Sequence, residues 1–122
     1  MARVPLLTRE DLQADKKEFF DQIAALRGHV ARPFSALLNS PDIAASVARV
    51  GDLLRYTSPT IPEDIREIIT LTTAKAFDCQ YVWTHHVGSA KQSGITEEVI
   101  EVIRDEPTPR KLLPKQAVFV QF

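Results

Sequence analysis

Two segments of the chain open with proline and acidic residues and then carry apolar residues at helical spacing. They begin with Ser-Pro-Asp at 40–42 and Pro-Glu-Asp at 62–64. Proline is favoured at the first helical position because its missing N–H would be unpaired there, and acidic side chains suit the positive end of the helix dipole. Asn-Gly and Asp-Gly turns between alternating apolar runs, which signal β-hairpins, are absent from the sequence. The sequence therefore predicts an all-α fold with short connections.

Caps and periodic apolar residues set the expected helix boundaries. We expect Thr8 to cap a first helix that Gly28 ends, and Ser40 to cap the helix over 41–57. Asp78 is the expected cap of a helix from Cys79 to about Ser93. The other expected elements are a helical turn over 32–38, a helix over 62–77, a short helix after Thr96, and the opening of a last helix at Pro114 that the chain cuts short.

Two of these segments carry an apolar stripe, which predicts the face that each helix buries. A small domain buries only a modest core, so wide apolar faces indicate that subunits pack together. The stripe of the helix over 41–57 consists of Ile43, Val47, Val50 and Leu54, and that of the helix over 62–77 consists of Ile65, Ile68, Ile69 and Thr72.

Length and composition limit the classes of protein to which the chain can belong. Its 122 residues predict a single domain over 1–122, and a net charge of −1 gives no electrostatic signature of nucleic-acid binding. No run approaches the roughly 20 apolar residues that cross a bilayer. The first residues lack the apolar core of a signal peptide, and one cysteine cannot form an internal disulfide. We therefore expect a cytoplasmic protein without membrane or nucleic-acid partners.

The segment DCQYVWTHHV, residues 78–87, gathers scarce residue types. Helical spacing puts Cys79, Trp83 and His86 on one face, whereas His85 points about 100° away. With Asp78 as cap, Cys79 would lie in the first helical turn, where the helix dipole favours the thiolate. The alternative is that Cys79 and Trp83 only pack in the core, as most free cysteines do. Both interpretations stay open at this point.

A carboxylate partner for this segment comes from the preceding helix. If the chain turns back near residues 77–78, Glu67 and His86 reach similar heights in an antiparallel helix pair, with Cys79 nearer the bend. Glu67 lies between Ile65 and Ile68, so it is expected to be partly buried, and a buried carboxylate needs a partner. We predict that His86 is this partner. A metal site is not expected, because adjacent histidines project in different directions from a helix.

The residues from 33 to 104 resemble the carboxymuconolactone decarboxylase family, which includes the alkylhydroperoxidase D-type peroxidases. Arg66-Glu67, the pattern Cys-x-Tyr-x-Trp-x-x-His over 79–86, and AKQSGITEEVI over 90–100 carry the resemblance. It implies an alkylhydroperoxidase D-like bundle built around a helical hairpin, assembled into homo-oligomers that are often trimers or hexamers. Relatives usually continue for tens of residues past the point where this chain ends, within the last expected helix.

The peroxidase branch of the family uses a Glu, two Cys three residues apart, and a His. The matching positions here are Glu67, Cys79, Val82 and His86, so valine replaces the second cysteine. A disulfide cycle needs two thiols. A one-cysteine cycle would need an external thiol to reduce the sulfenic acid.

The decarboxylase branch needs neither a second cysteine nor a cofactor. Loss of carbon dioxide from a carboxylated lactone leaves a dienolate, which needs an oxyanion donor and an acid. The resemblance implies that His86 supplies the proton and Glu67 fixes its tautomer. Arg49, Arg55 and Arg66 are candidates to bind substrate carboxylates. The expected site thus has Glu67, Cys79 and His86 as catalytic residues and Tyr81, Trp83 and His85 as substrate-binding residues.

Three functions are compatible with these features. The first is a cofactor-free decarboxylase acting on a small carboxylated lactone or an aromatic-derived acid. The second is a single-cysteine peroxidase or redox sensor that uses Cys79. The third is a non-enzymatic oligomeric scaffold that has kept the core of the family. The residues favour the first, with a small-molecule substrate and further copies of the chain as partners.

Overall fold

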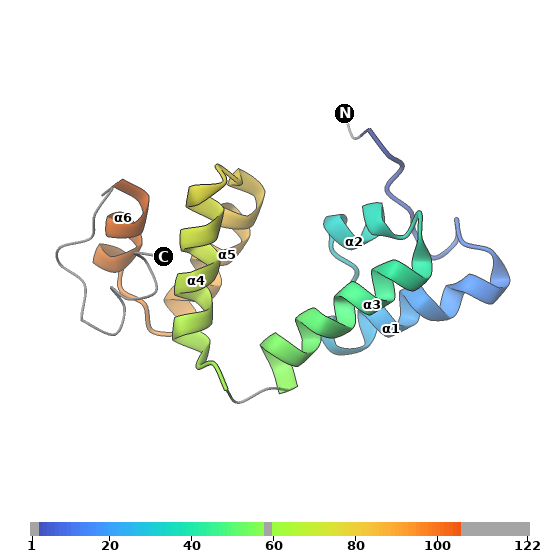
Figure 1. Cartoon of the computed structure of the whole chain (residues 1–122), viewed down its shortest axis with the longest axis horizontal. Coiled ribbons are helices and arrows are strands. Elements are labelled where there is room, and N and C mark those ends of the chain that lie inside the picture. The colour runs from blue at the N-terminus through green and yellow to red at the C-terminus, as the bar shows by residue number, and fades with distance from the viewer. Residues whose placement is uncertain (1–2, 58–59, 106–122) are drawn as a thin grey trace. The chain divides into compact units, whose positions relative to one another are not determined.

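The structure is a computed structural model that describes residues 3–57 and 60–105. All regular secondary structure in these residues is helical, which confirms the predicted all-α class (Figure 1). The chain forms two compact units, Met1–Ser58 and Pro59–Phe122, called the first and the second unit below. The single domain expected over 1–122 stays a prediction. No helix in the described residues combines the length and the apolar character needed to cross a membrane.

The first unit is a small helical assembly in which α1 and α3 make the main contact. Its buried core contains Leu12, Ile23, Leu38, Ala44 and Ala48. The two alanines are small, so they leave room for α1 on the side of α3 that packs. The elements are a 3-10 turn at Ala14–Lys16, α1 at Lys17–Arg27, α2 at Arg32–Leu37, α3 at Pro41–Asp52 and a π-helical turn at Leu53–Thr57.

The predicted start of the first helix at Thr8 is wrong, because α1 begins only at Lys17. Asp11 accepts hydrogen bonds from the backbone N–H and the hydroxyl of Thr8, both at 2.8 Å. These bonds close a separate turn ahead of the helix. Gly28 ends α1 as predicted, with a φ of 73° and its N–H donated to the Ala24 carbonyl at 2.8 Å.

Helix α3 begins as the sequence predicts but buries a different face. Ser40 is the N-cap and Pro41 the first helical residue. The apolar stripe expected to be buried is exposed, since Ile43, Val47 and Val50 keep 46 to 58% of their surface. Ala44 and Ala48, on a neighbouring face, are buried instead. Spacing identified an amphipathic helix correctly, but the small residues, not the large ones, contact α1.

An arginine holds the end of α1 against the end of α3. Nη2 of Arg27 lies 2.6 Å from Oδ1 of Asp52 and donates to the Ala48 carbonyl at 3.0 Å. Both charged side chains are largely buried, with 12% and 13% of their surface exposed. The guanidinium also lies over the ring of Phe34, 4.5 Å from its centroid. A Cβ atom added to Gly51 would lie 2.9 Å from Nη2, so glycine leaves space for this contact.

The second unit is built on an antiparallel hairpin of two helices covered by a third (Figure 1). The elements are α4 at Glu63–Ala76, α5 at Gln80–Gln92 and α6 at Glu97–Asp105. Ile65 and Ile68 of the predicted inner face are fully buried, whereas Ile69 and Thr72 are half-buried. The buried core consists of Ile65, Ile68, Leu71, Ala90, Ile95, Ile100 and Ile103.

The ends of α5 and α6 follow the predicted signals. Gly94, with a φ of 91°, ends α5, and Ile95 then donates its N–H to the Ala90 carbonyl at 3.0 Å. The Thr96 hydroxyl accepts from the N–H of Val99 at 3.5 Å in the first turn of α6. The last helix predicted at Pro114 lies outside the described residues.

Candidate active site

The site depends on the turn between α4 and α5. The conformation of this turn differs from the predicted one. Asp78 does not cap α5; it has a φ of 49° and terminates α4 instead. Its N–H donates to the Lys75 carbonyl at 3.1 Å, and the N–H of Cys79 donates to the Ala74 carbonyl at 2.8 Å. These two bonds form a Schellman motif, in which the residue after the C-cap takes the left-handed conformation. Cys79 is therefore the N-cap of α5 and precedes its first turn.

The tight turn brings Glu67 of α4 against His86 of α5. Oε2 of Glu67 lies 2.7 Å from Nδ1 of His86, which confirms the predicted contact. The Glu67 side chain keeps 4% of its surface exposed and that of His86 keeps 19%. Glu67 is the only polar or charged residue that is buried in the described part of the chain. Burying a carboxylate removes its hydration, which costs free energy. A buried carboxylate therefore needs a partner that compensates this loss.

The contact determines how His86 can exchange a proton. A carboxylate accepts hydrogen bonds, so an ionised Glu67 receives the N–H of Nδ1. The tautomer is thereby fixed, and Nε2 is the ring nitrogen through which His86 would give or take a proton. The carboxylate also stabilises the positive charge of a doubly protonated ring. The pair thus has the organisation of a general acid–base group with an orienting partner.

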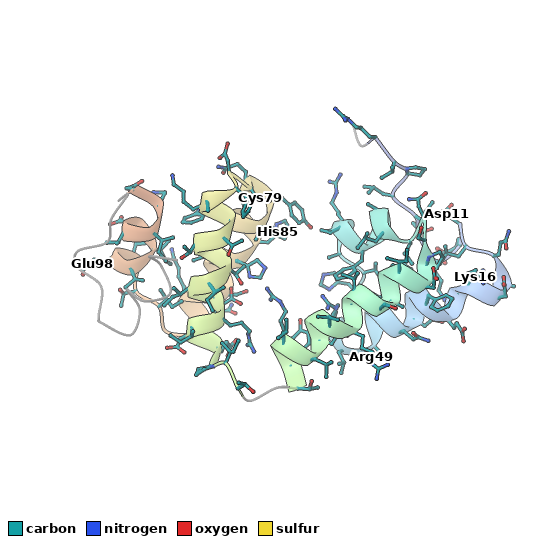
Figure 2. The ribbon with its side chains drawn as sticks, in the orientation of Figure 1. Asp11, Lys16, Arg49, Cys79, His85 and Glu98 are labelled. Atoms are coloured by element: carbon teal, nitrogen blue, oxygen red, sulfur yellow. The ribbon has the colours of Figure 1, made fainter. Side chains whose placement is uncertain are left out.

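Cys79 lies at the end of the hairpin, on the side of the bend, as the sequence predicted (Figure 2). It is a free cysteine with a half-buried side chain. Its carbonyl accepts the N–H of Trp83 at 3.0 Å, which is the first helical bond of α5. Cys79 and His86 are separated by two helical turns along α5. Of the two, His86 is the residue that contacts Glu67.

Tyr81 and His85 contact one another on the exposed side of α5. Their ring centroids are 4.1 Å apart, and Nδ1 of His85 donates to the Tyr81 carbonyl at 2.8 Å. His85 is exposed whereas His86 is half-buried, which agrees with the different directions expected for adjacent helical residues. Trp83 is half-buried and packs against the core of the second unit. The substrate-binding roles of these three residues stay predictions.

The arginines proposed to bind substrate carboxylates differ in position. Arg66 is half-buried on α4, directly before Glu67. Arg49 is exposed on α3, and Arg55 lies in the π-helical turn that follows it. Arg66 is thus the candidate on the same helix as the carboxylate of the pair. In the described residues, no group of three or more His, Cys, Asp and Glu side chains is placed to hold a metal ion.

Comparison with known proteins gives one family match. Residues 41–117 match the model described as the carboxymuconolactone decarboxylase family. The matched stretch begins with the first residue of α3 and includes α4, α5 and α6. It confirms the resemblance carried by the motifs within residues 33–104. No curated protein and no solved structure matches the chain.

Proposed function

The chain belongs to the carboxymuconolactone decarboxylase family, and we propose that it is a cofactor-free enzyme that decarboxylates a small carboxylated lactone or an aromatic-derived acid. Glu67 and His86 are its acid–base pair. The observation that supports this proposal is the 2.7 Å contact between a buried carboxylate and an imidazole. Burial and a short hydrogen bond together keep the imidazole in one orientation and one tautomer, which proton transfer to a fixed substrate atom requires.

The reaction is a carbon–carbon cleavage followed by protonation. The bond between the carboxylate carbon and the ring carbon breaks, and carbon dioxide leaves. The electron pair stays in the ring as a dienolate whose negative charge extends to the lactone carbonyl oxygen. His86 in its doubly protonated form donates the Nε2 proton to a ring carbon, and Glu67 stabilises the imidazolium until then. His86 recovers a proton from solvent, so the net reaction consumes one proton and releases carbon dioxide.

The remaining functions are proposed for side chains of α4 and α5. Arg66 is proposed to bind a carboxylate of the substrate, because it is a half-buried cation on the helix that carries Glu67. Trp83, which shares a face of α5 with His86 by helical spacing, is proposed to contact the substrate body. Tyr81 and His85, which contact one another on the exposed side of α5, are proposed to contact the part of the substrate that reaches that side. An arginine pairs with a carboxylate through two parallel N–H donors, which fixes orientation as well as charge.

The test of the proposal is carbon dioxide release from γ-carboxymuconolactone by the purified chain. His86→Ala should lower turnover at least about 100-fold, the usual contribution of a general acid–base group. His29→Ala is the matched control, since His29 is an exposed histidine of the first unit and should leave turnover unchanged. Turnover that survives in His86→Ala, with the protein folded, would refute the assignment.

A single-cysteine peroxidase is the second candidate, favoured by the free, half-buried Cys79 at the start of α5. Its thiolate would attack the peroxide oxygen, releasing an alcohol or water and leaving a sulfenic acid. A first external thiol would convert the sulfenic acid into a mixed disulfide and release water, and a second would restore the Cys79 thiol and leave with the first as an external disulfide. Mass spectrometry after mild peroxide treatment separates the two functions. Cys79 that stays unmodified in folded protein removes this candidate, and protein inactive in both assays supports a non-enzymatic scaffold.

We also propose that the chain assembles with further copies of itself in the cytoplasm. The apolar residues that α3 and the following π-helical turn leave exposed support the assembly, because contiguous apolar surface of this kind is usually an interaction site. They are Ile43, Val47, Val50, Leu53, Leu54 and Tyr56, each at least 46% exposed. The single free cysteine supports a reducing compartment. The family resemblance suggests a trimer or a hexamer.

A further inference from the structure

Two residues of opposite charge lie near the two ends of α3. Asp42 is in the first turn of the helix and Arg49 is in its last turn, and both are exposed. Seven residues are close to two helical turns, so the two side chains leave the same side of α3 about 10.5 Å apart along its axis. In the part of the chain that the structure describes, neither of them makes an ion pair.

The exposed apolar residues of α3 lie beside this charged side. Ile43, Val47 and Val50 keep 54%, 46% and 58% of their surface exposed. Ser46 is exposed as well, and helical spacing places it between this stripe and the side that carries the two charges. The exposed part of α3 therefore has an apolar strip, a small polar residue near its middle, and one charge of each sign along one edge.

This pattern is self-complementary when α3 is reversed about its middle. Consider a second α3 laid antiparallel on the first, with a two-fold axis near Ser46. Within one residue, Asp42 then lies at the height of Arg49 of the second copy, and Ile43 lies at the height of Val50 of the second copy. A contact of this isologous kind makes each favourable pair twice. The antiparallel order also sets the positive end of each helix dipole beside the negative end of the other.

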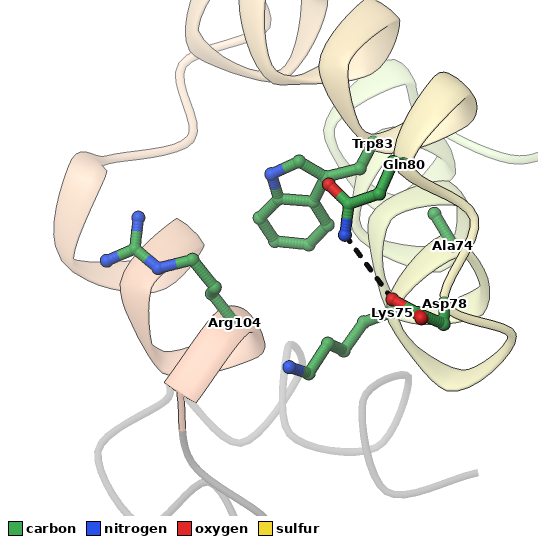
Figure 3. A pocket seen from close by; sticks show the side chains of 6 residues that line it. All are labelled: Ala74, Lys75, Asp78, Gln80, Trp83 and Arg104. Carbon is green, nitrogen blue, oxygen red and sulfur yellow. Dashed lines mark hydrogen bonds between the residues drawn. The ribbon is translucent and has the colours of Figure 1, made fainter.

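Opposite charges of the second unit are balanced locally, unlike those of α3. Arg104 pairs with its neighbour Asp105. It also lines a pocket of about 90 Å³ between α4, α5 and α6, where Lys75 and Asp78 add one charge of each sign (Figure 3). The pocket thus has no clear preference for a charged partner. On α3, by contrast, a charge of each sign lacks an ion-pair partner among the described residues.

We propose that two copies of the chain pair through antiparallel α3 helices, with Asp42 of each copy bound to Arg49 of the other and the apolar strips packed beside these ion pairs. The inference rests on the self-assembly proposed above and adds the geometry of one contact. It also distinguishes the two assemblies that the family resemblance suggests. A cyclic trimer contains no two-fold axis, whereas a hexamer with dihedral symmetry does, so this contact requires an even number of copies.

An exchange of charges tests the pairing. Asp42→Arg places two arginines opposite one another in each ion pair, and Arg49→Asp places two aspartates there. Because like charges across an interface oppose association, each variant alone should associate at least about tenfold more weakly in sedimentation velocity. In an equimolar mixture of the two variants, every pair again joins opposite charges, so the mixture should recover the wild-type species. Circular dichroism of each variant checks that it is folded.

Cross-linking tests the position of the axis without altering a charge. Ser46→Cys, made together with Cys79→Ser, should form a disulfide between two copies under mild oxidation, because residues beside the axis face one another across closely packed helices. Gln22→Cys with Cys79→Ser is the matched control, since Gln22 is exposed on α1 and should cross-link far more slowly.

The outcomes separate this pairing from the assembly on which it rests. Wild-type protein that stays monomeric at high concentration would overturn both. Wild-type protein that assembles, together with a mixture that does not recover or single variants that assemble normally, would overturn the α3 pairing alone. An odd number of copies in the wild-type assembly, or equal cross-linking at residues 46 and 22, would do the same.

Discussion

Glu67 and His86 are nineteen residues apart in the sequence, yet Oε2 of the first lies 2.7 Å from Nδ1 of the second. The two side chains come from neighbouring antiparallel helices, α4 and α5. Their contact depends on the turn at Phe77, Asp78 and Cys79, which reverses the chain without a longer loop. The chemistry proposed for the pair therefore rests on the conformation of a few residues that take no part in it.

Asp78 adopts a left-handed conformation in this turn, so we expect substitutions of Asp78 to change the stability of the fold. Asp78 and Gly94 occupy the same position in the Schellman motifs that end α4 and α5, but only Gly94 adopts a positive φ without strain. Asp78→Gly should raise the free energy of unfolding by about 1 kcal/mol, and Asp78→Val should lower it by about 1–2 kcal/mol. Urea unfolding followed by Trp83 fluorescence measures both. A destabilised glycine variant would show that the Asp78 side chain matters more than its backbone.

The contact of the largely buried Arg27 side chain with Asp52 predicts a second effect on stability. Arg27→Met removes the partner of Asp52 and the donor to the Ala48 carbonyl. The free energy of unfolding should fall by about 3 kcal/mol, because a charge is left buried and unpaired. Adding Asp52→Asn should recover part of the loss, since the unpaired charge is then gone. Circular dichroism in urea measures unfolding through the helices of both units, the first included. Additive losses in the double variant would contradict a coupled pair.

The turn ahead of α1 predicts a pH effect. The N–H of Thr8 and then its hydroxyl lower the pKa of Asp11 in the folded chain. A carboxyl with a folded pKa below its unfolded value stabilises the fold above the unfolded pKa, and this contribution is lost as the pH falls through the folded pKa. Thr8→Val removes the hydroxyl but keeps the N–H, so the Asp11 pKa should rise only part of the way. Carboxyl carbon NMR titration measures it, and an unchanged pKa would contradict the hydroxyl contribution.

The exposed apolar face of α3 predicts a change in oligomeric state. Val50 keeps 58% of its surface exposed and belongs to the set of apolar residues proposed to contact a second copy. Val50→Glu should shift the protein to smaller species in sedimentation velocity, because a charge at a subunit interface must be desolvated. Gln22→Glu adds the same charge at an exposed polar position of α1, outside the proposed face, and should leave the assembly intact. If both variants sediment as species of the same size, this face of α3 is not the subunit interface.

Local signals in the sequence were sufficient to predict most helix ends. These signals act through the backbone or side chain of the residue itself, so their effects do not depend on distant residues. Examples are Ser40 and Pro41 at the start of α3, Gly28 at the end of α1 and Thr96 at the start of α6. The contact of Glu67 with His86 was also predictable, because the spacing on both sides of the bend places them at similar heights. The catalytic use of this contact remains a proposal.

The features that the sequence did not reveal depend on tertiary partners or on competing local bonds. Thr8 bonds to Asp11 in a turn of its own, so it does not start α1. Asp78 resembles an N-cap by residue type, but its backbone serves the end of the preceding helix. The prediction of which side of α3 is buried was wrong. Periodicity identifies an apolar stripe on a helix, but it does not show which other element packs against that stripe. Lys75 and Arg104 are on different helices, and no spacing rule brings them to one pocket.

A double-mutant cycle on the Glu67–His86 pair tests the central proposal most directly. Carbon dioxide release from γ-carboxymuconolactone is measured for the wild type, Glu67→Gln, His86→Gln and the double variant. If the two residues act as one unit, each single substitution should lower kcat at least about 100-fold, and the double variant should be no slower than the slower single variant. Losses that multiply in the double variant, or a single variant with full turnover, would contradict an acid–base pair.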